Sequence, residues 1–217
     1  MSRLEFEPRS HTYTLDGEPV PSVTTILEAE GLVDYSYAPA LAMERGSEVH
    51  KAIHFELERA TTGGISAESR ERLESRGWLH YVESALCALD ELGAVTFRSE
   101  QFVFHSALRY AGRLDWLGFF RDRRDDAVII DFKSTSHIQP GMGLQLAAYA
   151  DAWEAMNPGA RVAARYVLRL HPNLPRGYSL EEFKNRDDRA TWRAAVVVHH
   201  WKRARGLASA KQTEGGF

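Results

Sequence analysis

The fold of this chain is decided by the stretch Ala127-Val-Ile-Ile-Asp-Phe-Lys133. Its nearly continuous run of apolar residues predicts a buried strand. Side chains alternate along a strand, so Asp131 and Lys133 share one face, while Ile130 and Phe132 share the other and can be buried. The strand therefore presents a carboxylate and an amine together at its end. Asp-x-Lys is a common tripeptide, and a surface ion pair at an exposed strand end is the alternative that it leaves open.

Two further strands are predicted directly before this one. Residues 95–105 and 110–120 are rich in β-branched and aromatic side chains. The second contains Gly112-Arg-Leu-Asp115, and antiparallel pairing with the next strand can bring Asp115 beside Asp131. Two carboxylates and an amine would then converge, and hard oxygen ligands of this kind suit Mg²⁺ or Mn²⁺.

The rest of the chain predicts helices and one more strand around this sheet. Residues 4–20 predict a hairpin that turns at Asp16-Gly17, and Ser22 is a suitable N-cap for a short helix ending near Glu30. The order of elements predicts an α+β or mixed α/β fold, with one central mixed sheet flanked by helices. The other predicted elements are helices over residues 38–60, 66–92, 141–156 and 187–205 and a strand over residues 161–170.

Two of these helices carry polar side chains that can reach the acidic residues. His50 lies at the edge of the apolar face of helix 38–60, where an imidazole would complete a His/Asp/Asp metal set. A lone histidine in this position is usually a core or boundary residue, whereas His54, one turn on, is expected to be solvated. Gln145 and Tyr149 share one face of helix 141–156, which follows the Asp131 strand directly. Structural packing is the default interpretation of such a pair.

Four patterns in this order resemble the RecB-like branch of the PD-(D/E)XK nucleases. That branch has a helical Arg-Gly-x-x-x-His, then Gly-x-x-Asp, Asp-x-Lys and Gln-x-x-x-Tyr. The resemblance covers about half the chain, residues 45–149, and implies a restriction-endonuclease-like core and a Mg²⁺-dependent DNA nuclease in which Mn²⁺ can substitute. The patterns stand here as Arg45-Gly46 to His50, Gly112 to Asp115, Asp131 to Lys133 and Gln145 to Tyr149.

The resemblance also implies roles for these residues. Asp115, Asp131 and His50 would hold the metal, with the Phe132 carbonyl as a further ligand. Lys133 would orient or deprotonate the attacking water and stabilise the developing charge. The catalytic set then comprises Lys133, Asp131, Asp115 and Glu100, the last as an extra acid for a second metal or its water shell. The expected DNA contacts are Arg45, Arg113, Ser134, Gln145 and Tyr149, of which the last two can alternatively brace Lys133.

The mode of DNA cleavage is left between alternatives. The histidine and Gln-x-x-x-Tyr favour an exonuclease, and the opening segment, with His11-Thr-Tyr and Pro21-Ser-Val-Thr-Thr-Ile-Leu27, is similar to compact phage or prophage nucleases. A phage-type or recombination and repair exonuclease is therefore expected, with a recombinase or single-strand annealing protein as a conceivable partner. A structure-specific or restriction-type endonuclease and an inactive DNA-binding module remain alternatives, and the oligomeric state stays open.

Length and composition agree with one domain of 217 residues and a net charge of −3. The expected parts are an N-terminal hairpin and short helix (1–37), the nuclease core (38–205) and a loose tail (206–217). Cys87, the only cysteine, is expected to be buried and excludes an iron–sulfur cluster held by four cysteines of one chain. No bilayer-spanning run or secretory signal is evident, so we expect a cytoplasmic protein of a bacterial cell or phage-infected host, without membrane contact.

Overall fold

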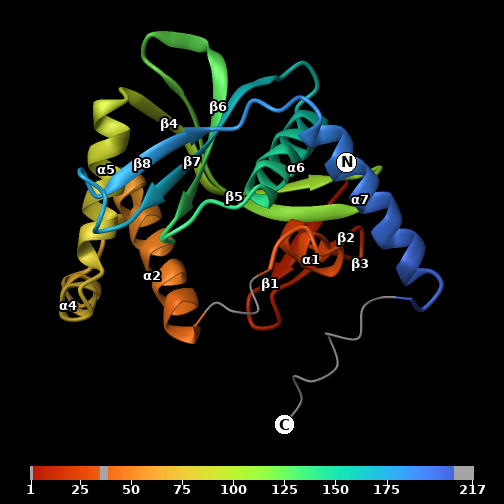
Figure 1. Ribbon diagram of the computed structural model, residues 1–217, viewed down its shortest axis with the longest axis horizontal. Helices are drawn as coiled ribbons and strands as arrows, with labels where there is room; N and C mark the ends of the chain where they lie inside the picture. The colour runs from red at the N-terminus through yellow and green to blue at the C-terminus, as the bar shows by residue number, and fades with distance from the viewer. Residues whose placement is uncertain (1, 35–38, 208–217) are drawn as a thin grey trace.

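The computed structural model describes residues 2–34 and 39–207 (Figure 1). A small antiparallel sheet comes first, formed by β1 (Leu4–Glu7), β2 (Thr12–Leu15) and β3 (Glu18–Val20). The main sheet has five strands in the order β4-β5-β6-β7-β8. They are β4 (Ala94–His105), β5 (Tyr110–Phe120), β6 (Arg123–Lys133), β7 (Val162–Leu170) and β8 (Tyr178–Glu182). The helices are α1 (Val23–Ala29), α2 (Ala40–Leu57), α3 (Arg59–Thr62), α4 (Ala67–Ser75), α5 (Leu79–Glu91), α6 (Gly141–Met156) and α7 (Asp188–Arg203).

The main sheet is mixed. β4, β5 and β6 pair in antiparallel fashion, β7 runs parallel to β6, and β8 is antiparallel to β7. A parallel pair needs a long crossover, and α6 supplies it between β6 and β7. The predicted α+β fold with a central mixed sheet and flanking helices is therefore confirmed.

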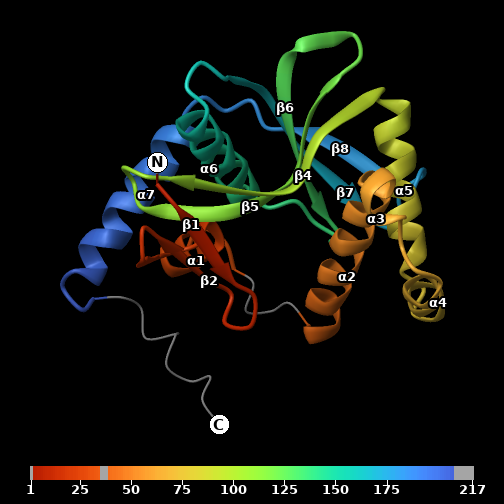
Figure 2. The same ribbon diagram turned by 180° about the vertical axis from the view of Figure 1, so that it is seen from behind.

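Helices cover both faces of this sheet, as Figures 1 and 2 show from opposite sides. One apolar core joins α1, α6 and α7 to the sheet and contains Ile129; the other joins α2 and α5 to it and contains Ile130 and Phe132. The predicted alternation along β6 is thus confirmed. Asp131 and Lys133 belong to the face that α6 covers.

The α6 helix is the most deeply buried helix of the fold. Every residue from Gly141 to Ala152 is buried, and a side chain at Gly141 would meet the carbonyl oxygen of Leu32 at 2.3 Å. Its first turn follows the end of β6 closely, so polar residues of α6 lie near Asp131. Within residues 2–34 and 39–207, no helix combines the length and apolar character that crossing a bilayer requires.

The N-terminal sheet is anchored on β5. Ala111 donates its backbone N–H to the carbonyl of Pro21 at 3.1 Å, and Tyr13, Leu15 and Val20 bury their side chains against Ala111. The Ser22 hydroxyl accepts a hydrogen bond from the Thr25 N–H at 3.0 Å, which confirms the predicted N-cap of α1. These contacts place the hairpin against the middle of the chain.

Two sequence expectations need correction, and one strand was missed. The helix predicted over residues 66–92 is two helices, because Gly77 adopts a left-handed φ of 66° between α4 and α5. Strand β8 was not predicted. Cys87 is exposed, since the buried face of α5 passes through Ala85, Ala88 and Leu89 instead. The tail predicted from residue 206 lies largely outside the described residues, as do residues 35–37 of the predicted N-terminal part.

Candidate active site

The site begins where β5 and β6 separate. Their pairing starts at Trp116 opposite Ile130, and extending the same register would set Asp115 opposite Asp131. At this point a side chain replaces the backbone ladder, because Asp115 Oδ2 accepts the N–H of Phe132 at 2.7 Å. Asp115 is 8% exposed, so this bond is protected from water. The end of the strand pair and the position of a candidate metal ligand are therefore fixed by one carboxylate.

Glu100 of β4 completes the acidic side of the site. The residues before and after it are paired with β5, which sets Glu100 opposite Asp115. Side chains at opposite positions of an antiparallel pair lie on the same face. Glu100 also has a φ of 51°, a left-handed backbone conformation that costs a non-glycine residue roughly 1 kcal/mol or more and is concentrated at functional sites.

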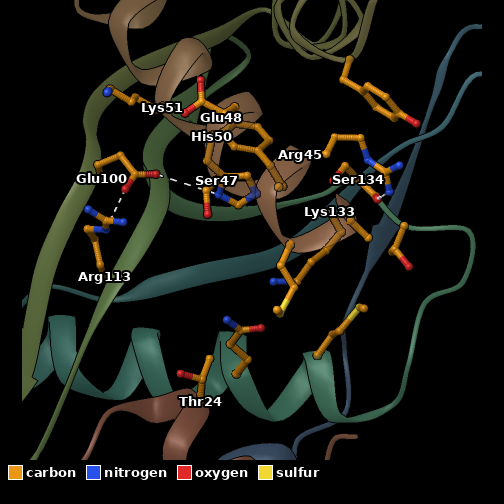
Figure 3. A pocket seen from close by; sticks show the side chains of 18 of the residues that line it. Thr24, Arg45, Ser47, Glu48, His50, Lys51, Glu100, Arg113, Lys133 and Ser134 are labelled. Carbon is orange, nitrogen blue, oxygen red and sulfur yellow. Dashed lines mark hydrogen bonds and ion pairs between the residues drawn. The ribbon is translucent and has the colours of Figure 1, made fainter. Parts of the chain in front are cut away.

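His50 of α2 faces both acids. Its Nδ1 is 3.3 Å from Asp115 Oδ1 and 4.0 Å from Glu100 Oε1. Figure 3 shows the Glu100 carboxylate between His50 and Arg113. One ligand atom from each of His50, Glu100 and Asp115 lies within 4.8 Å of the other two. We call these three residues the metal cluster, because two carboxylates and an imidazole at this spacing fit a divalent cation.

The charges of this cluster shift one another's pKa values. Burial alone would lower the pKa of His50, but the charges of Asp115 and Glu100 outweigh it and raise the pKa to about 9. Burial and the neighbouring Asp115 raise the pKa of Glu100 to about 7. Burial opposes ionisation of Asp115 as well, yet His50 and Lys133 hold its pKa below the usual value. A proton on His50 therefore balances the carboxylate charge in the metal-free protein.

Asp131 and Lys133 form a second group beside the metal cluster. Lys133 Nζ lies 2.7 Å from Asp131 Oδ2, and the two side chains are 19% and 2% exposed. Burial raises the pKa of Asp131 to about 6 against the opposing charge of Lys133, and Asp115 adds to the increase. The three acids and the lysine thus share one electrostatic environment. One oxygen of Asp131 faces Lys133, and its role as a metal ligand remains a prediction.

Gln145 and Tyr149 contact one another on α6, as their spacing predicted. Gln145 Nε2 donates to the Tyr149 hydroxyl at 2.9 Å, and each residue is only 4% exposed. Burial raises the pKa of Tyr149 well above its usual value, so the phenol stays neutral. A Cβ on Gly112 would lie 2.8 Å from the Tyr149 ring. The glycine of the Gly-x-x-Asp pattern therefore makes room for the tyrosine of the Gln-x-x-x-Tyr pattern.

A groove of about 1360 Å³ opens over these groups. It runs from Arg113 and Glu100 past His50 to Lys133, Ser134 and Arg45 (Figure 3). Arg113 Nε lies 2.7 Å from Glu100 Oε2 and is 42% exposed, in reach of a ligand. The cationic and imidazole side chains that line the groove are His11, Arg45, His50, Lys51, His54, Arg113, Lys133, His137 and His171.

Two arginines of the chain form hydrogen bonds within the fold. Arg45 donates to the Ser134 carbonyl at 2.8 Å, and its guanidinium lies 5.2 Å from the centre of the Tyr81 ring. Its predicted DNA contact is untested, but its guanidinium already ties α2 to the end of β6. Arg109 is not among the residues that line the groove, and it donates to the Leu15 carbonyl at 3.4 Å.

Sequence reasoning missed three residues that line the groove, His11, Thr24 and Phe102. His11 and Thr24 precede the four patterns in the chain, and Phe102 lies between two of them. Thr24 stands near the foot of the groove in Figure 3. For His11 and Thr24, the only signal was the likeness of the opening segment to phage nucleases. His54, expected to be solvated, is partly buried, with Nδ1 2.5 Å from Ser99 Oγ.

Comparisons with known proteins place this arrangement in a family. No curated protein matches the sequence. Among solved structures, an alkaline exonuclease from Laribacter hongkongensis is 14% identical, with a TM-score of 0.40 over 76% of this chain and 92% of that chain. Its complex with dAMP gives 14% and 0.43 over 87% and 95%. A protein from Eubacterium rectale described as a candidate exonuclease is 8% identical, with a TM-score of 0.49 over 91% and 80%. Residues 27–215 match the profile of one family, and the chain accordingly belongs to the PD-(D/E)XK nuclease superfamily.

Proposed function

We propose that this protein is a divalent-metal-dependent deoxyribonuclease that degrades DNA as an exonuclease in phage or recombination and repair processes. The observation that carries the proposal is the metal cluster of His50, Glu100 and Asp115 beside the Asp131–Lys133 pair. His50, Glu100 and Lys133 of these groups line the groove. Membership of the PD-(D/E)XK nuclease superfamily supports phosphodiester hydrolysis as the chemistry. Mg²⁺ is the proposed metal, with Mn²⁺ as a substitute.

The cation would be held by the metal cluster, with Asp131 and the Phe132 carbonyl as further proposed ligands. When bound, such a cation polarises a phosphoryl oxygen and lowers the pKa of water. His50 must lose its proton to become a ligand. The negative charges of Asp115 and Glu100 would then neutralise the cation in place of the protonated imidazole. The Phe132 N–H donates to Asp115 Oδ2, while Asp115 Oδ1 faces His50.

Lys133 is the proposed catalytic lysine. Its ammonium group is held by Asp131 at 2.7 Å and reaches into the groove. From there it can orient the attacking water and stabilise the negative charge that develops on the phosphate. Asp131 would then also position Lys133, because its carboxylate orients the ammonium group. Arg113, on the other side of Glu100, is a proposed contact for a neighbouring phosphate.

DNA hydrolysis by wild type, Lys133→Ala and Asp115→Asn tests the proposal. With Mg²⁺ or Mn²⁺, we expect wild type to degrade end-labelled linear DNA and each variant to lose roughly a hundredfold or more in rate. Lys184→Ala is the matched control, because Lys184 is a lysine that is 75% exposed and lies outside the groove. Undiminished hydrolysis by folded Lys133→Ala and Asp115→Asn would contradict the assignment.

The exonucleolytic mode has its own test. A covalently closed circular DNA has no end, so an exonuclease should leave it intact while it degrades the same DNA after linearisation. Cleavage of both forms at equal rates would instead establish an endonuclease. A recombinase or single-strand annealing partner is a further part of the proposal, and pull-down with such a protein from the same genome would test it.

A further inference from the structure

A cluster of three aromatic rings, Phe6, Tyr13 and Phe102, lies at one edge of the groove. Phe6 of β1 packs against Tyr13 of β2, with ring centres 4.8 Å apart, and against Phe102 of β4 at 5.2 Å. Tyr13 and Phe102 are 6.2 Å apart. Tyr13 is only 3% exposed, so this aromatic cluster is part of the packing between the N-terminal sheet and the main sheet.

Two planar polar groups contact this aromatic cluster. The imidazole of His11 meets the Phe6 ring edge-on at 5.1 Å, and the Arg113 guanidinium lies 5.8 Å from the centre of the Phe102 ring. His11 is the last residue of the turn between β1 and β2 and has a left-handed φ of 51°. Both side chains are exposed, and with Phe102 they line the groove.

This edge directly adjoins the metal cluster. Arg113 Nε lies 2.7 Å from the Glu100 carboxylate. His11 and Arg113 also border a small cavity of about 110 Å³, whose wall includes His50, Glu100 and Asp115. A nucleotide whose phosphate approaches the cluster from this side therefore has ring and guanidinium planes next to it.

We propose that His11, Phe102 and Arg113 form a nucleobase-stacking subsite that takes an unpaired nucleotide of the DNA strand being cut. The proposal rests on the proposed nuclease function and names its substrate state. Every base has a π-face, so stacking on aromatic rings or guanidinium planes is tolerant of sequence. Inside a duplex, both faces of a base are covered by its neighbours. A nucleotide other than the outermost one can therefore stack here only from a single strand or a frayed end.

Binding of two strands that differ only in their bases tests the subsite. The probes are a short oligothymidylate and an abasic strand of the same length, measured with Ca²⁺ by fluorescence anisotropy. His11→Asn removes the ring, yet asparagine tolerates the left-handed backbone that His11 adopts. We expect this variant to bind oligothymidylate about tenfold more weakly and the abasic strand as wild type does. His11→Phe should keep the wild-type preference for bases.

The matched control is Phe97→Leu, which removes another aromatic ring of β4. Phe97 is 52% exposed and lies outside the groove, so the ratio of the two affinities should not change. Equal weakening of both strands by His11→Asn, or no weakening of either, overturns the subsite, provided that thermal melting shows the variant folded. Those outcomes would not contradict the proposed nuclease function. That function is tested separately, by DNA hydrolysis with the wild type and its loss in Lys133→Ala.

Discussion

Two glycines of the sequence patterns differ in what surrounds them. A methyl group on Gly112 would lie 2.8 Å from the Tyr149 ring and 3.2 Å from Val23, whereas one on Gly46 would come no closer than 3.9 Å to Ser134. Overpacking a core costs about 1–3 kcal/mol, and alanine in place of a helical glycine gains about 1 kcal/mol. We therefore expect Gly112→Ala to lower the free energy of unfolding and Gly46→Ala to raise it. Urea denaturation measures both, and a Gly112→Ala protein as stable as wild type would refute the tight packing against Tyr149.

The raised pKa of His50 predicts how metal binding depends on pH. His50 titrates at about 9 in the metal-free protein and must be neutral to act as a ligand. Binding therefore releases a proton, and the affinity for Mn²⁺ should rise by up to tenfold per pH unit as the pH approaches about 9. Below about 7, the proton on Glu100 adds to this slope.

Calorimetry in buffers of different ionisation enthalpy measures that proton release. His50→Gln is the informative comparison, because it removes the titrating group while it keeps a polar side chain. Its weaker affinity for Mn²⁺ should vary less with pH between neutrality and pH 9. An affinity of wild type that stays constant over this range would show that His50 is no ligand.

The sequence predicted which residues gather at the site but not how they divide. His50, Asp115, Asp131 and Lys133 follow from strand alternation and from the patterns. The compact cluster, however, includes Glu100 and leaves one Asp131 oxygen to Lys133. That division depends on the left-handed backbone at Glu100 and on where β5 and β6 part, neither of which local spacing encodes.

At the scale of elements, Arg45 joins α2 to the end of β6. Its hydrogen bond to the Ser134 carbonyl and its position over the Tyr81 ring suit a planar guanidinium better than an ammonium group. We expect Arg45→Lys to lower the free energy of unfolding by about 1–2 kcal/mol. Arg70→Lys, an exposed arginine of α4, is the control and should change it little. Circular dichroism measures the free energy of unfolding of both variants. Equal changes in the two would contradict the role of Arg45 in joining α2 to β6.

Elements with long, regular patterns were predicted best. Residues 141–156 match α6 and residues 110–120 match β5, because burial acts along their whole length. The break at Gly77 was missed, since apolar residues continue on both sides of a turn of only a few residues. None of the five residues of the short edge strand β8 is fully buried. Backbone pairing with β7 defines this strand, and no sequence period reveals that pairing.

At the scale of the whole molecule, charge is distributed unevenly. The net charge is −3, whereas basic side chains outnumber acidic ones in the groove lining. The lining includes Arg45, Lys51, Arg113 and Lys133 against Asp34, Glu48 and Glu100. Phosphate contacts make DNA affinity fall with salt, and each contact contributes about 1 to the slope of log affinity against log salt. We expect Lys51→Gln to reduce that slope by about 1. Lys184→Gln, a change of equal charge outside the groove, should leave it unaltered, and equal slopes for wild type and Lys51→Gln would remove Lys51 from the DNA path.

The joint between the N-terminal sheet and the core could not be predicted from sequence. The hairpin and the N-cap of α1 are local features and were predicted from a few residues each. Their attachment to Ala111, by contrast, depends on contacts between segments some ninety residues apart in the chain. Only that attachment carries His11 to the groove, which is why the patterns within residues 45–149 contain no sign of it.

Asp115 gives the molecule an asymmetric tolerance of mutation. One of its oxygens closes the gap between β5 and β6, and the other faces His50. Replacement by a residue without an acceptor would therefore loosen the sheet as well as the metal cluster. Lys133, by contrast, is partly exposed at a strand end and can be lost with less damage to folding. In homologues that lose activity, we therefore expect substitution of Lys133 more often than substitution of Asp115. An Asp115 retained in such a homologue would reflect the needs of the fold rather than catalysis.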